Sequence, residues 1–309
     1  MKNSDIYQTI TDRIIQGLQK GRIPWRKTWK AATGMPKNFI NKRPYRGANI
    51  LVLWFHMMAY GFSQPYYLTF KQVNKLGGKV KKGSKSELVI YWQWLERETG
   101  ERKKDGSAKV KRIPLLRYYR VFNIEQTEGI EYEKPEDKQM PEFKQIEAAE
   151  NFVKNYQDRP PIQHGGGRAC YSPTDDKIQM PKPETFESEP AYYGTLFHEL
   201  THSTGHKYRL NRDDGMAGFF GDENYSREEL TAEIGTAFIC ALTGISNEKL
   251  EENQQAYINN WISKLESDPK MVILASARAQ KAVDYMRGIT HDQKTAEESE
   301  ERDTAGASA

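Results

Sequence analysis

The sequence has little cysteine and no long apolar run. Its 309 residues include two cysteines, Cys170 and Cys240. They lie far apart and predict no disulfide framework, so we expect a reducing compartment. Residues 1–13 lack the apolar core of a signal peptide, and the most apolar stretch, residues 51–62, is too short to span a bilayer. We therefore expect a cytoplasmic protein without membrane contact, with a buried helix at 51–62.

Acidic residues are scarce in the first part of the chain. Residues 1–120 contain 26 lysines and arginines but only 7 aspartates and glutamates, whereas the remainder contains 20 and 35. The net charge of +4 hides this asymmetry. A strong field of one sign is what binding to a polyanion requires, so the first part predicts a nucleic-acid partner. Solvation of a charged surface is the alternative interpretation.

The pattern of elements predicts an α+β protein. Ile6, Ile10, Ile14 and Leu18 recur every four positions and indicate an amphipathic helix at 4–19. Residues 87–98 and 113–126 are rich in β-forming side chains and flank a charged connection, which predicts two antiparallel strands. We expect residues 1–126 to form an α+β domain with an antiparallel sheet.

The chemistry of the chain changes at residues 127–143. This stretch is acidic, contains proline and has no apolar period, so we interpret it as a linker. A second domain at 144–290 should be mostly helical with a small sheet, and residues 291–309 should form a disordered tail. Its predicted helices, apart from the one discussed next, cover residues 144–157, 227–242, 252–265 and 269–287.

Residues 196–206, LFHELTHSTGH, hold three of the six histidines. His198 and His202 are one helical turn apart, so both rings can reach one point, as two ligands of a tetrahedral metal do. Glu199 lies next to the first ligand, where it can take a proton from a water whose pKa the metal lowers. This is the H-E-x-x-H arrangement of zinc proteases. Ser188 is the expected N-cap, and Gly205 is expected to end the helix.

The third ligand is less certain from the residues alone. In the template H-E-x-x-H-x-x-G-x-x-H the last position would fall on Tyr208, so that class does not apply. A glutamate from the following helix is the alternative, with Glu229 preferred and Glu233 second. The glutamate that does not bind metal could orient a histidine. Glu229 could instead form a capping box with Ser226.

Two further residues are candidates for polarising a scissile carbonyl. Tyr171 lies in residues 169–172, which we expect to be an edge strand that pairs with an extended peptide. His206 lies one turn beyond His202. A surface tyrosine and a capping histidine are the plainer interpretations of the two.

Longer motifs carry a family resemblance. FHELTHSTGHKYRLNR and SREELTAEIGTAF resemble the metallopeptidase domain of ArdC-type antirestriction proteins. RPYRGANILVLW, YLTFKQVNKLGGKVKKGSK and RYYRVFNIEQTEG resemble the single-stranded-DNA-binding domain of that family, which is also similar to the N-terminal part of TraC-type primases. The likeness covers roughly residues 5–126 and 145–287.

The resemblance implies a zincin fold for the second domain and a gluzincin-type site. In such sites the third ligand is a glutamate about 27 residues after the second histidine, in an E-x-x-A pattern, which Glu229 matches. Zinc is the expected metal, although these ligand types also accept Mn, Co or Ni. The resemblance also implies single-stranded DNA as a partner. The residues expected to line its path are Trp25, Arg26, Lys42, Arg43, Tyr45, Arg46, Lys81, Lys82, Lys109 and Arg112.

Together these features predict an antirestriction protein that protects incoming plasmid DNA during conjugation. It would bind single-stranded DNA, carry a metallopeptidase site and cleave a protein substrate such as a component of a restriction system. The alternative is a DNA-coating protein whose metal site is structural only. A further alternative is a soluble protease whose basic half binds another anion.

Overall fold

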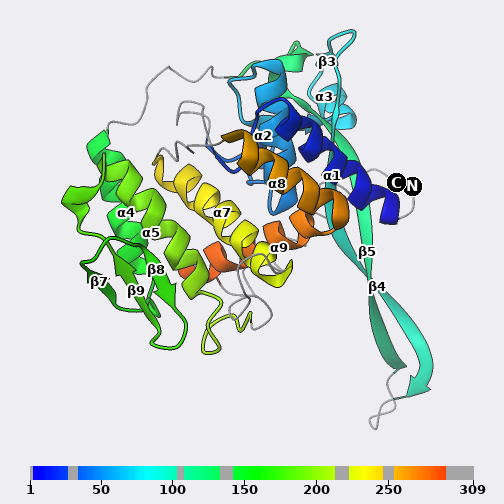
Figure 1. Ribbon diagram of the computed structural model, residues 1–309. Coiled ribbons are helices and arrows are strands. Elements are labelled where there is room, and N and C mark those ends of the chain that lie inside the picture. The colour runs from blue at the N-terminus through cyan, green and yellow to red at the C-terminus, as the bar shows by residue number, and fades with distance from the viewer. Residues whose placement is uncertain are drawn as a thin grey trace.

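The computed structural model describes residues 3–26, 34–102, 108–132, 142–212, 223–245 and 254–289. It combines helices with three small sheets, which confirms the predicted α+β class (Figure 1). Most of the expected linker and the expected tail lie outside the described residues, so their state stays a prediction. Among the helices that are described, none is both long and apolar enough to cross a membrane.

The first half is built on a four-stranded sheet with the order β1-β2-β5-β4. Strands β4 and β5 pair antiparallel, as the sequence predicts, while β1 is parallel to β2. The helix α2 packs on β4, and its residues 48 and 50–57 are buried, as expected for the most apolar stretch of the chain. The elements of this half are α1 (Asn3–Gln19), β1 (Lys37–Asn38), α2 (Ala48–Tyr60), β2 (Tyr66–Thr69), α3 (Phe70–Lys75), β3 (Lys79–Val80), β4 (Glu87–Arg102), β5 (Ala108–Asn123), a 3-10 turn (Ile124–Gln126) and β6 (Thr127–Glu128).

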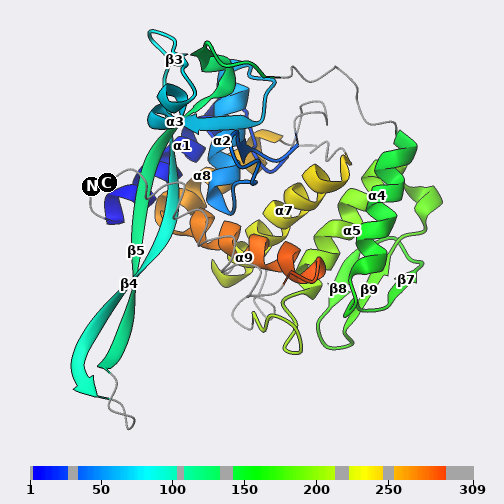
Figure 2. The same cartoon turned by 180° about the vertical axis from the view of Figure 1, so that it is seen from behind.

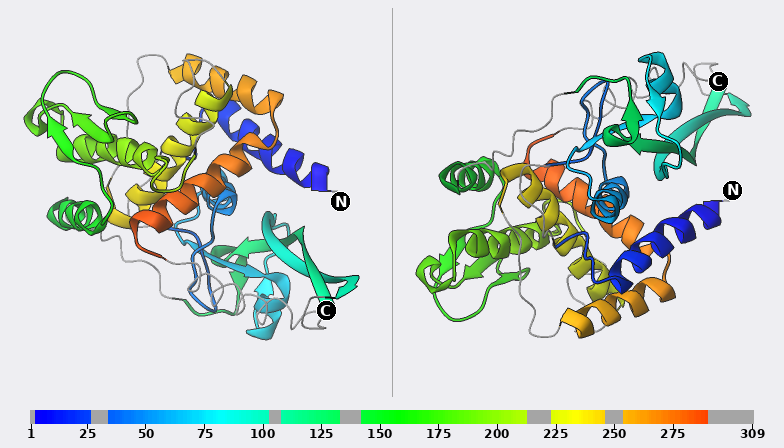
Figure 3. Two further views of the ribbon diagram at one scale, coloured as in Figure 1. Left: turned by 90° about the horizontal axis from the view of Figure 1, so that it is seen from below. Right: turned by 90° about the horizontal axis from the view of Figure 1, so that it is seen from above.

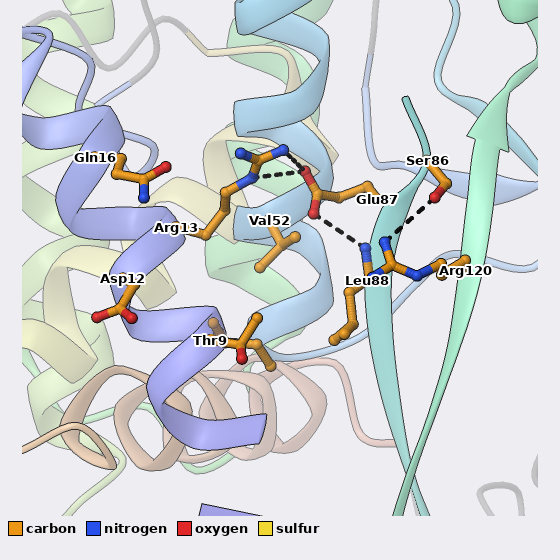
Figure 4. A pocket seen from close by; sticks show the side chains of 10 residues that line it. Thr9, Asp12, Arg13, Gln16, Val52, Ser86, Glu87, Leu88 and Arg120 are labelled. Atoms are coloured by element: carbon orange, nitrogen blue, oxygen red, sulfur yellow. Dashed lines mark hydrogen bonds and ion pairs between the residues drawn. The ribbon is translucent and has the colours of Figure 1, made fainter. Parts of the chain in front are cut away.

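The β4–β5 hairpin projects far beyond the rest of the molecule, as both Figure 1 and Figure 2 show. Its base is fixed to α1 beside a cavity of about 350 Å³ (Figure 4). There Arg13 Nε and Nη2 each donate to Glu87 Oε2 at 3.0 Å. Glu87 Oε1 accepts the Leu88 backbone N–H at 3.0 Å. Since Arg13 of α1 and Glu87 of β4 neutralise each other across this cavity, we interpret the pair as a brace for the hairpin.

A small second core supports β2, α3 and the β3–β6 pair. Leu68, Val73 and Ile124 are fully buried in it. Thr69 caps α3 with a capping box, accepting from Gln72 N while Gln72 returns a bond to the Thr69 N–H. This cap fixes the direction in which α3 leaves β2.

The second half places helices over a three-stranded sheet with the order β7-β9-β8. Helix α7 packs between α5 and α9 (Figure 3). The predicted helices are confirmed with ends shifted by a few residues, whereas β7 was missed because its three residues carry no apolar alternation. The elements are α4 (Glu142–Asn155), β7 (Ile162–His164), β8 (Cys170–Ser172), β9 (Lys177–Met180), a 3-10 turn (Pro183–Thr185), α5 (Glu189–Ser203), α7 (Glu223–Thr243), α8 (Gln254–Ser267) and α9 (Met271–Met286).

One apolar core joins the two halves. Helix α1 packs on α8 and α9, and α2 also packs on α9, so the first two helices of the chain lie against its last two. Trp54 of α2, for example, contacts Phe238 of α7 edge-on with 6.0 Å between ring centroids. The hydrophobic core therefore extends across the proposed division at 127–143, with residues from both sides of it.

Three expected DNA contacts are buried, two of them in this junction. Trp25 is 0% exposed, and its Nε1 donates to the Tyr257 hydroxyl at 2.9 Å. Arg26 Nη2 lies 3.2 Å from Glu233 Oε1, and its guanidinium stacks on the Tyr257 ring. Tyr45 is 8% exposed. The prediction that these three side chains line a DNA path is wrong for this structure, because each is packed into the core.

The Arg26–Glu233 pair generates a stability prediction. Both side chains are nearly buried, at 7% and 11% exposure. Arg26→Ala leaves the Glu233 carboxylate desolvated without this cation, which should destabilise the fold by about 3–5 kcal/mol. Urea unfolding of the full chain measures this loss. Lys177→Ala, which breaks the exposed Lys177–Asp175 pair, is the control and should cost less than about 1 kcal/mol. Equal effects of the two substitutions would contradict the assignment.

Candidate metal centre

Helix α5 carries the H-E-x-x-H residues and begins as the sequence predicts. The Ser188 hydroxyl accepts a hydrogen bond from Ala191 N at 3.3 Å, and Pro190 lies in the first turn. The helix ends at Ser203, before Gly205. This short, capped helix places His198 and His202 on one face, one turn apart.

The structure brings His198, His202 and Glu229 together. The Nε2 atoms of the two imidazoles are 3.1 Å apart. Glu229 Oε1 lies 3.5 Å from His202 Nε2, and Glu229 Oε2 lies 3.6 Å from His198 Nε2. Glu229 comes from α7, which begins at Glu223, so Ser226 lies inside the helix and cannot be an N-cap. The capping-box interpretation of Glu229 is therefore wrong.

These separations fit a divalent cation. Ligand atoms around a tetrahedral zinc lie about 3.3 Å apart, because the zinc–nitrogen distance is about 2.0–2.1 Å. Within the described residues, only this group of histidines, cysteines and carboxylates has the geometry to hold a metal. Two imidazole nitrogens that face one another across 3.1 Å share a single proton at most, so a cation between them would satisfy both lone pairs.

Glu228 orients His202, a role that the sequence did not assign to it. Its Oε1 lies 3.3 Å from His202 Nδ1. The carboxylate is 3% exposed and also receives Arg212 Nε at 3.0 Å and Nη2 at 2.7 Å. Arg212 is itself tied to the end of α5 through the Thr201 carbonyl and the Thr204 hydroxyl. A carboxylate that holds the outer nitrogen of a histidine directs the inner nitrogen toward a metal.

The carboxylates dominate the electrostatics of this group. Burial alone would lower the pKa of His202, but hydrogen bonds and charge from Glu228 and Glu229 raise it to about 10. Burial would likewise raise the pKa of Glu229, yet the two histidines hold it well below its usual range. Glu229 is therefore ionised, and a divalent cation would bind by displacing the proton of His202, because an imidazole that ligates a metal is neutral.

Glu199 is held by the neighbouring sheet. Its Oε2 accepts the backbone N–H of Tyr171 at 2.7 Å, and Glu199 as a whole is 8% exposed. Tyr171 lies on β8, which is an edge strand, as predicted for residues 169–172. Cys170 on this strand is exposed rather than buried. The base candidate is thus bonded directly to the outer edge of β8.

Tyr171 and His206 belong to a different cluster. The Tyr171 hydroxyl donates to Asp176 Oδ1 at 2.8 Å, and Arg209 forms a bidentate pair with the same carboxylate at 2.7 and 2.9 Å. His206 Nδ1 lies 3.9 Å from Asp176 Oδ2. Burial and the bond to Asp176 raise the pKa of Tyr171. These contacts direct both side chains toward Asp176 and not toward the three-ligand group.

Glu233 also serves another contact. It pairs with Arg26 of the first half, so the prediction that it binds or orients at the metal centre is wrong. Tyr225, which the sequence did not single out, lies close to the site instead. Burial, together with the charge and a hydrogen bond of Glu229, raises the pKa of the Tyr225 hydroxyl to about 12. It therefore stays protonated as a donor beside the ligands.

The remaining predicted DNA contacts occupy varied positions. Lys42, Lys81 and Lys82 are exposed. Lys81 Nζ donates to the Glu125 carbonyl at 2.8 Å, and Arg46 pairs with the buried Asp284 of α9. Arg43 is half-buried. Lys109 and Arg112 lie on β5, but their side chains are outside the described part of the structure.

Two protein families match this chain, one in each half. Residues 4–122 match the N-terminal domain of anti-restriction factor ArdC, and residues 147–278 match a zincin-like metallopeptidase. The zincin-like match agrees with a site for a divalent metal, and the motif residues 198–202 lie inside it.

Proteins with whole-length likeness include solved structures. The antirestriction protein ArdC from the R388 plasmid has a TM-score of 0.71 in its metal-free form, with 35% identity over 92% of this chain and 97% of that chain. Its Mn(II)-bound form matches with the same TM-score and coverage, at 34% identity. The agreement extends over both halves.

Sequence relatives give the same picture. The uncharacterized protein y4eC of Sinorhizobium fredii (strain NBRC 101917 / NGR234) is 35% identical, with 94% of each chain covered. Two DNA primases TraC of Escherichia coli are 32% and 33% identical, but this chain spans only 28% and 20% of their length. With an ArdC-type N-terminal domain, a zincin-like domain and whole-length likeness to a solved ArdC, this chain belongs to the ArdC antirestriction family.

Proposed function

We propose that this protein binds single-stranded DNA with its first half, hydrolyses a peptide bond at the His198–His202–Glu229 site, and so protects plasmid DNA that enters a restricting cell by conjugation. The observation that carries the proposal is the convergence of three metal-binding side chains beside Glu199. We assign zinc as the native metal, with Mn, Co and Ni as the other metals that such ligands accept. The protein substrate would be a component of a restriction system, and the protein would act in the cytoplasm.

Metal binding, ligand orientation and proton transfer would fall to different residues of the site. His198, His202 and Glu229 would hold the metal, while Glu228 keeps His202 in its binding orientation. A divalent cation there would supply Lewis-acid polarisation of a peptide carbonyl and a water with a lowered pKa. Glu199, fixed by the Tyr171 amide, takes the proton and returns it to the leaving amine.

Two further groups would position the substrate. Strand β8 is an edge strand next to Glu199, which suits an extended peptide paired through backbone groups other than the Tyr171 amide, since Glu199 accepts that amide. The Tyr225 hydroxyl, rather than Tyr171 or His206, is the nearby donor for a developing oxyanion.

A purely structural metal site is the second candidate. It is favoured by the Glu199–Tyr171 bond, because a carboxylate that accepts a backbone amide at 2.7 Å also ties α5 to the sheet without any catalysis. In that case the protein would protect DNA by coating it.

Metal uptake tests the ligand set. The metal-free full chain should take up one equivalent of Mn²⁺ or Zn²⁺ and unfold at a higher temperature with it, because the metal binds the folded chain. Glu229→Ala should abolish this uptake, and Glu228→Gln should weaken it about 10- to 100-fold. Calorimetric titration measures both, with exposed Glu266→Ala as the matched control. Unchanged affinity in Glu229→Ala would remove Glu229 from the ligand set.

Glu199→Gln separates the two candidate functions. This variant should keep its metal, since Glu199 is not a ligand, but lose about 10²- to 10⁴-fold in peptide hydrolysis. The measurement is conjugative transfer of a plasmid with restriction sites into restricting and non-restricting recipients. Failure to protect would support proteolysis, whereas full protection would establish coating. Glu189→Gln, an exposed position on the same helix, is the control and should behave like the wild type.

The salt dependence of DNA binding tests the first half. If cationic side chains replace counterions on a single strand, the logarithm of the affinity should fall linearly with the logarithm of salt concentration, by about 0.7 per phosphate contacted. Fluorescence anisotropy with a labelled oligothymidylate measures the slope. An affinity that barely changes with salt would count against a phosphate-tracking surface and favour another anionic partner.

A further inference from the structure

Strand β1 and the tight loop that follows it hold the side chains of Lys37, Phe39 and Lys42 in a fixed arrangement. The Asn38 N–H donates to the Arg43 carbonyl at 2.9 Å and closes the loop. Asn38 Oδ1 accepts the Ile40 and Asn41 amides at 2.9 and 3.3 Å, and Asn41 Oδ1 accepts Arg43 N at 3.0 Å. Lys42 has a φ of 59°, a left-handed conformation that is uncommon outside glycine. The loop is therefore held in one conformation by its own asparagines.

This loop and β2 together build a platform of two rings and two ammonium groups, which we call the aromatic platform: Phe39, Tyr66, Lys42 and Lys37. The rings of Phe39 and Tyr66 meet edge to face, with centroids 5.6 Å apart. Lys42 Nζ lies 3.9 Å from the Phe39 centroid and 4.5 Å from that of Tyr66. Lys37 Nζ lies 5.5 Å from the Tyr66 centroid. Each ring keeps part of its surface in solvent while its other side packs on the small core.

The stretch of sequence that forms the platform carries charge of one sign, and Glu128 of β6 faces Lys79 of β3 at its border. Residues 34–86 contain eight lysines and two arginines and no aspartate or glutamate. Ile40, which follows Phe39 in the chain, is 42% exposed, and Phe70, at the start of α3, is 54% exposed. Leaving part of an aromatic ring in water costs free energy, and the charged side chains alone would keep the surface soluble. Half-buried rings within a cationic stretch therefore differ from an ordinary solvated surface.

We propose that the aromatic platform is the base-stacking site for single-stranded DNA, with Phe39 and Tyr66 contacting an unpaired base and Lys42 and Lys37 contacting its flanking phosphates. The inference rests on the proposed DNA binding and names where it occurs. Unpaired bases offer the free faces that such rings stack on, whereas the bases of a duplex are already stacked on one another. On binding, the flexible Lys42 side chain exchanges its contact with the rings for a phosphate and uncovers them.

Two substitutions separate the stacking contact from the charge contact. Phe39→Leu keeps an apolar side chain on the small core but removes the aromatic face. Lys42→Gly removes the ammonium and, because glycine adopts positive φ readily, does not strain the loop. Lys154→Ala, which removes an exposed charge from α4, is the matched control. Thermal unfolding of each full-length variant verifies its folding.

Anisotropy titrations with oligothymidylate at several salt concentrations distinguish the outcomes. Phe39→Leu should weaken binding at least about fivefold with an unchanged salt slope, because stacking releases no counterions. Lys42→Gly should weaken binding and reduce the slope by about 0.7. A duplex of the same length should lose much less affinity in Phe39→Leu than the single strand does.

The failure of this inference differs from the failure of DNA binding itself. If the wild type binds no oligonucleotide at any salt concentration, the proposed DNA binding is wrong. If the wild type binds and both variants bind equally well with the same slope, the platform is not the stacking site. If the variants lose affinity only for vesicles of phosphatidylserine and phosphatidylcholine, the surface is a membrane contact and the inference is also overturned.

Discussion

The metal centre depends on the close approach of α5 and α7. At their contact, a Cβ atom on Gly235 would lie 2.5 Å from Thr201 Cγ2, which is closer than two carbon atoms can pack. Thr201 is one of the two residues between Glu199 and His202. The absence of a side chain at Gly235 therefore lets α7 lie against the motif itself, and Glu229, less than two turns earlier, reaches both imidazoles. A wider separation of the helices would leave His198 and His202 with no third ligand.

Three glutamates on α7 point in different directions and bind different partners. Glu228 points to Arg212 and His202, Glu229 to the two imidazole Nε2 atoms, and Glu233 to Arg26. Residues 228 and 229 differ by about 100° around the axis, so neighbours in sequence serve different partners. Glu228 and Glu233 are nearly buried, whereas the Glu229 side chain is 28% exposed. Each has a cationic or imidazole partner, which is the condition under which a buried charge is tolerated.

The sequence predicted what depends on local spacing and failed where the partner is distant. His198 and His202 converge because two residues four apart share a helix face, and Ser188 caps α5 because its hydroxyl needs only the next turn. Glu233 was considered for the centre because nothing near it in sequence reveals Arg26, which lies 207 residues away. Trp25, Arg26 and Tyr45 have the composition of a DNA contact. However, Trp25 and Arg26 are covered by Tyr257 of α8, and Tyr45 packs on Tyr67 of β2. The Asp176 cluster that holds Tyr171 and His206 likewise forms only when a turn meets the end of α5.

The shared core and two ion pairs hold the basic first half against the half that carries the metal ligands. Arg26 of the first half is paired with Glu233, and Glu233 is four residues, about 6 Å along the axis, from Glu229. Arg46 is paired in the same way with the buried Asp284 of α9, which packs on α7. Moving the first half away from the second would leave two buried carboxylates without these cations and expose α1 and α2, and each change costs free energy. The basic half is thus part of the framework that positions the metal ligands, because the two family domains share one apolar core.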